Sequence, residues 1–404
     1  MQGSSARQKI QGENALAKPD FKENSKKRST SVEYVDVVNM DYTLLITAIL
    51  LTLFGIVMVY SSSYYTASTS AAFGYDMFGP VRSQIMAAIV GFAAMLLISS
   101  LSYSNVLRMF TIPAYVGAIV LLILTAKYGV EVNGARRWII LPIIGRFQPS
   151  EVAKIAIIMA MAHIIDYKKS MADNWVGIAK LGALIGILAA VIGKGTNNWS
   201  SAILICIIGF GTIFVASAKT WPFVAAGTAA ASGLALFLAL GGDAVRSGRF
   251  SAWLDPFSDP TDKGFQIVQS LFAIGSGGMF GLGLGQSRQK LGFIPEAHND
   301  IIFSVICEEL GFIGAILVLF LFGVYLWRAI KIALNAKDLY GCLLATGIAL
   351  MVGSQALINI AVVTNSMPNT GVPLPFISHG GTSLDVMLFC TGILLNISRF
   401  QKAN

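Results

Sequence analysis

Charged residues are scarce in this chain. Asp, Glu, Lys and Arg make up 12% of its 404 residues, whereas 55% are hydrophobic and the mean hydropathy is +0.69. Because a soluble domain carries about 25% charged residues, this composition indicates a multi-pass membrane protein. The net charge of +8 does not indicate nucleic-acid binding, since excess Lys and Arg in membrane proteins set topology and bind anionic lipid.

Cysteine and histidine are too few to suggest a disulfide framework or a zinc site. The 4 cysteines lie in apolar runs without CxxC spacing, and the 3 histidines are His163, His298 and His379, without an HExxH motif. The glycines between Gly275 and Gly285 are not followed by GK[ST] and no strand precedes them, so no nucleotide or other organic cofactor is expected. Gly277, Gly281 and Gly285 instead favour close helix packing or flexible backbone near a ligand.

Long apolar runs fill most of the chain. A helical span needs roughly 20 apolar residues, so the pattern predicts an all-α polytopic membrane protein with about ten transmembrane helices. Residues 1–40 are polar and predict a disordered tail, with 41–400 as the membrane domain. No apolar run precedes residue 43, so a cleavable signal peptide is not expected. The expected spans are 43–61, 83–101, 110–126, 149–165, 177–193, 200–217, 221–241, 301–327, 341–363 and 381–398.

The positions of Lys and Arg predict that both termini are cytoplasmic. The tail, the connection at 166–176, the connection after 327 and the C-terminus all carry basic residues, and an even number of spans places them on one side. Two outer loops break this rule. The short loop 127–148 contains Arg136 and Arg137, and the large loop 242–300 contains Arg246 and Arg249. Such cations indicate an anionic ligand outside, or else pairing with local acids or lipid headgroups.

The large extracytoplasmic loop is not a plain linker. Residues 265–274 are amphipathic at helical spacing, which predicts helices that lie on the outer membrane face or re-enter it. Its last residues, Pro295-Glu296-Ala297-His298-Asn299-Asp300, place two acids and a histidine where the chain enters an apolar run. Ionisable groups at such a border are functional candidates.

Asp300 has two interpretations. It precedes Ile301-Ile302-Phe303, so it is placed to cap the helix, a contribution of about 1 kcal/mol. A carboxylate at a helix N-terminus is also suited to act as a general base. Glu296 and His298 in the same turn favour catalysis or cation binding, which makes Asp300 a candidate metal ligand as well. Glu308 and Glu309 follow about 12 Å further along the helix, and we expect buried structural pairing with Arg or Lys from other spans.

A second polar block leads into the span at 149–165. Arg137 is followed by Phe147-Gln148-Pro149-Ser150-Glu151, and Lys154 comes one turn later. Glu151 and Lys154, three residues apart, form a simple ion pair in one interpretation. In the other, Arg137 and Lys154 bind a phosphate, with bidentate contacts from the arginine.

Together these blocks resemble the SEDS family of shape, elongation, division and sporulation proteins. The resemblance covers roughly residues 41–400. It rests on Val59–Ser63, Asn133–Trp138, Phe147–Lys154, Lys263–Gln266 with the glycines, Pro295–Asp300 with Glu308–Gly311, and Pro373–Ser383. It implies a peptidoglycan glycosyltransferase that uses lipid II, with Asp300 as the essential acid and Arg137 and Lys154 as further functional residues. The Pro-Glu-Ala-His form is similar to the division and sporulation branch. Two departures occur: Thr196-Asn197-Asn198 lacks the usual Pro and acid, and His379 stands in the usual Ser-Tyr-Gly-Gly.

The resemblance also implies a mechanism and partners. Asp300 would deprotonate a sugar hydroxyl, with Mg²⁺ or Mn²⁺ as the candidate cofactor. The candidate residues for binding the substrate or its pyrophosphate are Arg136, Arg137, Lys154, Arg246, Arg249, Glu296 and His298. The expected partners are a class B penicillin-binding protein and the division or sporulation machinery, in the bacterial plasma membrane. A lipid II flippase, an ion-coupled transporter and a non-catalytic scaffold for a transpeptidase are the alternatives.

Overall fold

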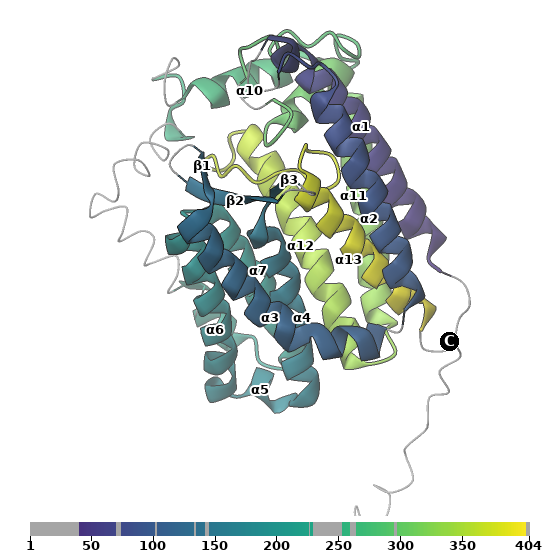
Figure 1. Ribbon diagram of the computed structural model, residues 1–404, viewed down its shortest axis with the longest axis vertical. Helices are drawn as coiled ribbons and strands as arrows, with labels where there is room; N and C mark the ends of the chain where they lie inside the picture. The colour runs from purple at the N-terminus through teal and green to yellow at the C-terminus, as the bar shows by residue number, and fades with distance from the viewer. Residues whose placement is uncertain are drawn as a thin grey trace, which may run out of the picture.

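The chain folds into a bundle of long helices with a small sheet and a short helix at one end (Figure 1). The computed structural model describes residues 40–69, 74–101, 103–132, 135–141, 145–225, 227–228, 253–258, 264–294 and 297–400. The principal elements are α1 (Tyr42–Thr69), α2 (Gly79–Ser100), α3 (Tyr103–Tyr128), β1 (Val130–Val132), β2 (Ala135–Leu141), β3 (Gly145–Phe147), α4 (Pro149–Tyr167), α5 (Ser170–Asp173), α6 (Trp175–Ala190), the π-helical turn η3 (Val191–Gly195), α7 (Trp199–Ala216), α10 (Phe265–Ser276), α11 (Ile302–Leu334), α12 (Leu339–Val363) and α13 (Gly381–Arg399).

The polytopic helical fold expected from the apolar runs is confirmed. Over the described residues, eight helices are long and apolar enough to cross a membrane. Helix α4 coincides with a ninth expected span, but it carries Glu151, Lys154 and Asp166 and lies packed among α3, α7 and α12. The tenth, 221–241, falls mostly outside the described residues. The expected tail 1–40 lies outside them too, apart from Met40.

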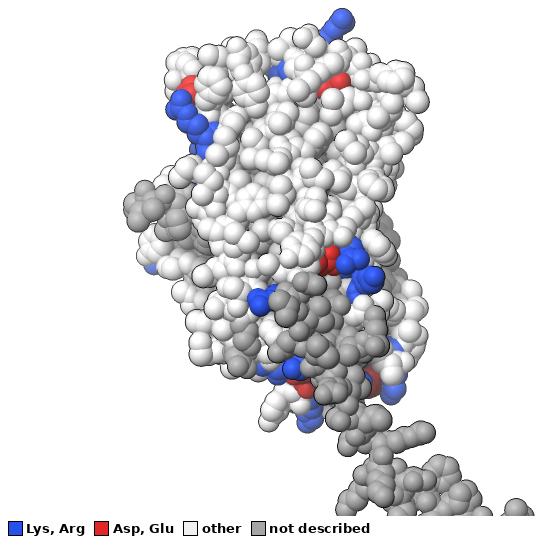
Figure 2. Space-filling model, turned by 90° about the vertical axis from the view of Figure 1, so that its right-hand side faces the viewer, with Lys and Arg blue, Asp and Glu red and all other residues white. Residues whose placement is uncertain are grey.

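The surface of the bundle suits a lipid environment. On the face in Figure 2, charged side chains lie toward the two ends, with a band of uncharged surface between them. Exposed apolar side chains follow one another along the outer helices, for example Ile46, Leu50, Leu53 and Val57 on α1. Helix α13 lies at the centre of the bundle, since 78% of the residues in its most apolar stretch are buried. Helix α13 packs along α2 and also contacts α4 and α12.

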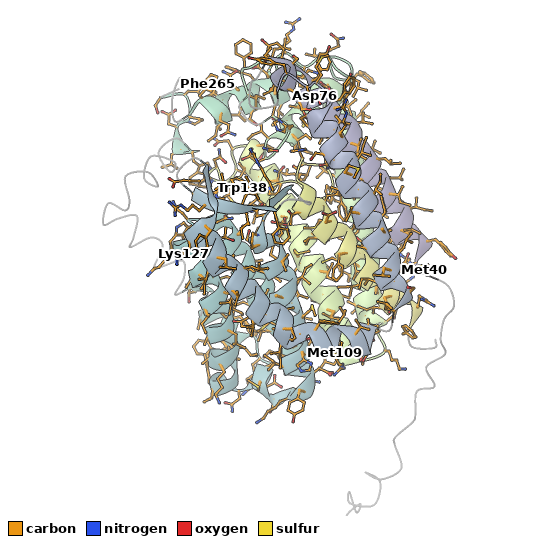
Figure 3. The ribbon with its side chains drawn as sticks, in the orientation of Figure 1. Met40, Asp76, Met109, Lys127, Trp138 and Phe265 are labelled. Carbon is orange, nitrogen blue, oxygen red and sulfur yellow. The ribbon has the colours of Figure 1, made fainter. Side chains whose placement is uncertain are left out.

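The loop 127–148 contains a three-stranded antiparallel sheet that the sequence analysis did not predict. Strand β1 pairs with β2, with Val130 opposite Trp138, and β2 pairs with β3, with Ile139 opposite Phe147. The sequence signal was the Asn-Gly dipeptide at 133–134, which is typical of a hairpin between two strands. In Figure 3, Trp138 marks the sheet, which lies below the start of α10 at Phe265.

Helix α10 confirms the amphipathic helix expected within the large loop. It runs from Phe265 to Ser276 and buries Ile267, Val268, Ser270 and Ala273. The Ser270 hydroxyl donates a hydrogen bond to the carbonyl of Val363, at the end of α12, over 2.9 Å. Helix α10 therefore packs against the end of α12 that carries Val363.

Helix α11 breaks at Gly311, where φ is +66° and ψ is −164°. The break exchanges backbone hydrogen bonds with the glycine-rich stretch that follows α10. Leu282 and Gly283 donate to the carbonyls of Glu308 and Glu309, each over 2.9 Å. Phe312 and Ile313 donate in turn to the carbonyls of Gly278, over 2.9 Å, and Met279, over 3.2 Å. Such pairing satisfies backbone groups that the broken helix would otherwise leave open at membrane depth.

Two of the three glycines expected to permit close packing do so. A Cβ at Gly277 would lie 1.9 Å from the carbonyl oxygen of Cys307, and one at Gly281 would lie 2.1 Å from that of Glu309. The expectation was wrong for Gly285, where nothing lies within 4 Å of a built Cβ. Gly285 has a φ of +81°, so the backbone conformation explains the glycine there.

Candidate functional site

Asp300 lies in the turn that leads into α11, at the end of the bundle where α10 packs. The N-cap of α11 is Ile301, without a side-chain hydrogen bond, so Asp300 stands one residue before the cap position. Asp300 is therefore near the helix start, as expected, and its capping and catalytic roles both stay predictions. The carboxylate remains close to the positive end of the helix dipole, which favours its ionised form.

Three hydrogen bonds fix the backbone of this turn. The side-chain nitrogen of Asn359 in α12 donates to the carbonyl of Asp300 over 2.7 Å. The Ser378 hydroxyl donates to the carbonyl of Asn299 over 2.6 Å, and the backbone N–H of His379 donates to that of His298 over 2.9 Å. Residues 298–300 and the Pro373–Ser383 block, far apart in sequence, are thus held together.

Gly371 forms a wall beside the Asp300 carboxylate. Its φ is +65°, and a Cβ built on it would lie 3.3 Å from Oδ2 of Asp300. The neighbouring carbonyl of Thr370 accepts a hydrogen bond from Ser200, in the first turn of α7. Residues 196–198, which depart from the family pattern, thus lead into α7, and Ser200 of α7 contacts the loop that contains Gly371. Asn198 caps α7 by accepting from the backbone N–H of Ser201 over 3.2 Å.

His298 and His379 lie together beneath the turn. Their ring centroids are 5.4 Å apart, and His298 is only 3% exposed. Burial lowers the pKa of both imidazoles from 6.5 to about 4, and for His379 the nearby His298 and the charge of Arg146 add to the effect. At neutral pH both rings are therefore uncharged, which suits hydrogen bonding rather than binding of an anion.

The sheet brings the arginine block to the same end. The backbone N–H of Gln148, after β3, donates to Oγ1 of Thr382 in α13 over 3.3 Å, and Thr382 donates to the carbonyl of Arg146. Arg136 and Arg137 are on β2; Arg137 is half-buried, whereas Arg136 is exposed and pairs with Glu131 over 3.3 Å. For Arg136 the structure therefore agrees with the alternative interpretation, in which a nearby acid pairs with the arginine.

Lys154 is buried inside the bundle, with 1% of its surface exposed. Its ammonium group lies 2.7 Å from Oε1 of Glu151, which is itself 2% exposed. The ion-pair interpretation therefore describes this structure. Its role toward a phosphate stays a prediction, and Oε2 of Glu151 receives no hydrogen bond from any described residue.

The remaining candidates have a mixed outcome. Arg246, Arg249 and Glu296 lie outside the described residues. Among those that the structure does describe, no group of three His, Cys, Asp or Glu side chains is placed to hold a metal ion. Because Glu296 is not described, the expectation of Mg²⁺ or Mn²⁺ at Asp300 stays a prediction, and no step of the proposed mechanism passes through a metal.

Asn359 is the residue that the sequence analysis missed. It is 1% exposed, and its side-chain nitrogen also donates to the carbonyl of Val372 over 2.7 Å. It therefore ties the turn at Asp300 to the loop at Gly371. A single asparagine in the apolar run 341–363 was the available signal, because a buried amide needs partners.

Comparison with known proteins identifies the family. The family model described as "Cell cycle protein", which covers FtsW, RodA and SpoVE, matches residues 41–403. This chain belongs to the FtsW/RodA/SpoVE family. The match spans all the membrane helices and the blocks that meet at Asp300, so the sequence resemblance is confirmed.

Curated members of the FtsW/RodA/SpoVE family are similar over nearly their whole length. "Probable peptidoglycan glycosyltransferase FtsW" of Geobacter sp. (strain M18) is 38% identical over 365 residues, which cover 90% of this chain and 97% of the relative. "Stage V sporulation protein E" of Bacillus subtilis (strain 168) is 39% identical over 377 residues, covering 90% and 98%.

Solved structures of the family share the fold. RodA, the rod shape determining protein of Thermus thermophilus, is 25% identical with a TM-score of 0.65, covering 91% of this chain and 99% of that one. A chain from the structure called "Structural coordination of polymerization and crosslinking by a peptidoglycan synthase complex" is 27% identical with a TM-score of 0.75, covering 91% and 100%.

Proposed function

We propose that this protein is a peptidoglycan glycosyltransferase that polymerises glycan chains from lipid II at the outer membrane face. The observation that carries the proposal is the position of Asp300. Its turn is fixed by three hydrogen bonds to main-chain carbonyls, and Gly371, which has no side chain, lies beside its carboxylate. Family membership and the printed names of the curated relatives support the reaction class.

In the proposed reaction, the Asp300 carboxylate takes the proton from the C4 hydroxyl of the acceptor sugar. The oxygen then forms a bond to the anomeric carbon of the donor, with inversion, as the bond from that carbon to the polyprenyl pyrophosphate breaks. A fixed turn reduces the reorganisation needed for this step. Arg137, Lys154, Arg246 and Arg249 are the proposed cations for the leaving pyrophosphate.

Lys154 has a specific condition attached to its proposed role. Its charge is already balanced by Glu151 over 2.7 Å, so contact with a phosphate requires the lysine to share or exchange that partner. Arg137, the other described candidate for the pyrophosphate, is half-buried on β2, and β2 contacts α4.

The alternatives receive no specific support from the structure. A flippase path would use Glu308, Glu309 and Lys154, but all three make buried ion pairs or hydrogen bonds within the protein. The polymerisation assay with purified protein distinguishes an enzyme from a scaffold without catalysis. The relation to a peptidoglycan synthase complex supports the proposal of a class B penicillin-binding protein as partner. Location in the bacterial plasma membrane with cytoplasmic termini, in division or sporulation, completes the proposal.

Asp300→Asn tests the assignment directly. The amide keeps the size of the side chain but cannot accept the proton, and we expect the rate of lipid II polymerisation by purified protein to fall about 100-fold or more. The thermal unfolding midpoint should stay within a degree or two of wild type. The assay is run with and without the penicillin-binding protein, and the labelled glycan product is resolved by length.

Asp76→Asn is the matched control, since Asp76 is another outer acid and pairs with Arg82 on the surface over 3.1 Å. It should polymerise lipid II as wild type does. Full activity of Asp300→Asn would remove Asp300 from the mechanism. A wild-type protein that moves labelled lipid II across a bilayer without forming polymer would favour the flippase.

A further inference from the structure

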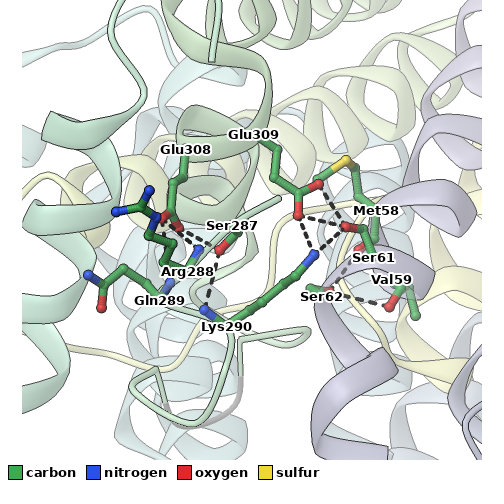
Figure 4. A network of polar contacts seen from close by, with 10 residues as sticks. All are labelled: Met58, Val59, Ser61, Ser62, Ser287, Arg288, Gln289, Lys290, Glu308 and Glu309. Carbon is green, nitrogen blue, oxygen red and sulfur yellow. Dashed lines mark hydrogen bonds and ion pairs between the residues drawn. The ribbon is translucent and has the colours of Figure 1, made fainter. Parts of the chain in front are cut away.

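Two buried carboxylates lie beside the break in α11, and both bind the segment that leads to Asp300 (Figure 4). Glu308 is 1% exposed and Glu309 is fully buried. Glu309 lies 2.6 Å from the ammonium group of Lys290 and accepts a hydrogen bond from Ser61 of α1 over 2.7 Å. Lys290 also donates to Ser61 over 3.0 Å. This contact joins α1, α11 and the loop.

Glu308 holds the same stretch of loop in another way. It accepts hydrogen bonds from the Ser287 hydroxyl over 2.5 Å, from the backbone N–H of Arg288 over 2.9 Å and from that of Gln289 over 3.4 Å. All three donors are neutral groups. We call Glu308, Glu309, Ser61, Ser287 and Lys290 together the glutamate clamp.

The glutamate clamp is the middle of three attachments along one segment. The first is the backbone exchange of residues 278–283 with α11, and the last is the set of main-chain hydrogen bonds at residues 298–300. Between them, residues 287–290 are held by the two glutamates. The path of the chain into the Asp300 turn is thus set from the side of α1 and α11 as well as from the loop at Gly371.

The chemistry of the clamp argues for positioning rather than for stability or catalysis. A buried ion pair often adds little net stability compared with neutral groups of similar size, although removing one partner costs about 3–5 kcal/mol. Ser61 and Lys290 have the residue types of a Ser–Lys catalytic dyad, but the ammonium pairs with Glu309, so it is not available as a base. The Lys290–Glu309 pair instead fixes the position of Lys290 against α11 and against Ser61 of α1.

We propose that Lys290, Glu309 and Ser61 are positioning residues that hold the segment leading to Asp300 in its productive geometry. The inference rests on the proposed function for the role of Asp300 itself. Without the contact among Lys290, Glu309 and Ser61, residues 287–290 are held to α11 by Glu308 alone, so the turn at Asp300 samples other positions. A misplacement of about 1 Å at a reacting group can lower a rate roughly 100-fold.

The test removes both charges together, because a single change would strand a buried charge. In the double variant Lys290→Met and Glu309→Gln, the ion pair is lost, the Glu308 contacts are retained and no unpaired charge remains. We expect a thermal unfolding midpoint close to wild type and faster backbone hydrogen exchange in peptides covering 285–300. We also expect a 10- to 100-fold lower kcat for polymerisation, with KM for lipid II within about twofold.

The matched control is the other buried Lys–Glu pair, changed in the same way as Lys154→Met and Glu151→Gln. That pair is local to α4, so hydrogen exchange in 285–300 should not change. Unchanged exchange in the Lys290/Glu309 variant would overturn the clamp, and faster exchange with wild-type kcat would overturn its link to Asp300. Because exchange needs no substrate, it decides on the clamp even if wild-type protein forms no polymer, an outcome that defeats the proposed function alone.

Discussion

Asp300 and the pair Glu308–Glu309 lie within ten residues of each other, yet the structure treats them differently. The two glutamates are almost completely buried, and their carboxylates accept hydrogen bonds from Ser61, Ser287 and Lys290. Asp300 is half-buried, and the contacts from Asn359 and its neighbours act on the backbone of its turn. One position has a fixed carboxylate, and the other has a carboxylate on a fixed backbone.

The difference separates two uses of a membrane-border acid. A carboxylate enclosed by its own donors serves the fold, because any change in its protonation or position breaks several contacts. Asp300 instead lies half-buried on a turn whose backbone is fixed, next to a glycine with no side chain. The extent of burial, rather than residue type, therefore distinguishes the structural acids from the candidate base.

Gly281→Ala should have the largest effect of the variants that test the structural role of the segment around Glu308 and Glu309. The new Cβ would meet the carbonyl oxygen of Glu309 at 2.1 Å, at a φ of +77°. Adding the left-handed conformation to overpacking, we expect about 2–5 kcal/mol of lost stability, seen as loss of monodisperse protein or a lower unfolding midpoint. Gly285→Ala is the control, with a φ of +81° but open space, and should cost roughly 1–2 kcal/mol. Equal effects would show that the contact with α11 contributes nothing.

Asn359→Ala tests whether the fixed backbone of Asp300 matters for catalysis. This change leaves the carbonyls of Asp300 and Val372 without their donor, at about 1–3 kcal/mol for each buried group. We expect a lower unfolding midpoint and a roughly tenfold lower kcat, since the turn of Asp300 is released.

Gln355→Met, one turn earlier in α12, is the control for that experiment. Gln355 is fully buried, and its side-chain amide has no hydrogen bond to any described residue. Its replacement by a neutral side chain of similar size should leave stability and kcat nearly unchanged. If both variants lose activity alike, the effect belongs to packing in α12 and not to the tether of Asp300.

The smallest expected effect concerns His298 and acid pH. Its pKa is lowered from 6.5 to about 4, so below pH 6.5 the unfolded chain binds a proton that the folded chain does not. Stability therefore falls as the pH falls through this window, by at most about 1.4 kcal/mol per pH unit. We expect His298→Gln to reduce the drop in unfolding midpoint between pH 7 and pH 5. An identical drop in both proteins would contradict the buried neutral histidine.

Much of the fold was predictable because apolar runs report directly on helices in a membrane. The position of Asp300 at a helix start followed from the polar block that ends where the run begins, and burial of Glu308 and Glu309 followed from their depth. The predicted source of their partners was wrong: Lys290 belongs to the preceding loop and not to another span. Helical periodicity places side chains on a face but does not say which loop folds back onto it.

The rest required the tertiary structure. The backbone pairing around Gly311 has no sequence signal other than glycines. Glycines at these positions are compatible with several structures. The sheet carries only three to seven residues per strand and lies between long helices, so a search for membrane spans passes over it. Asn359 was visible as a polar residue in an apolar run, but its two acceptors come from two distant loops.

The break in α11 also sets an order of assembly. Residues 278–283 are synthesised before residues 308–313, yet each supplies the backbone partners of the other. Residues 278–283 therefore have no backbone partners from α11 until that helix has been made. This stretch and α11 form one folding unit, in which the later helix completes the earlier segment.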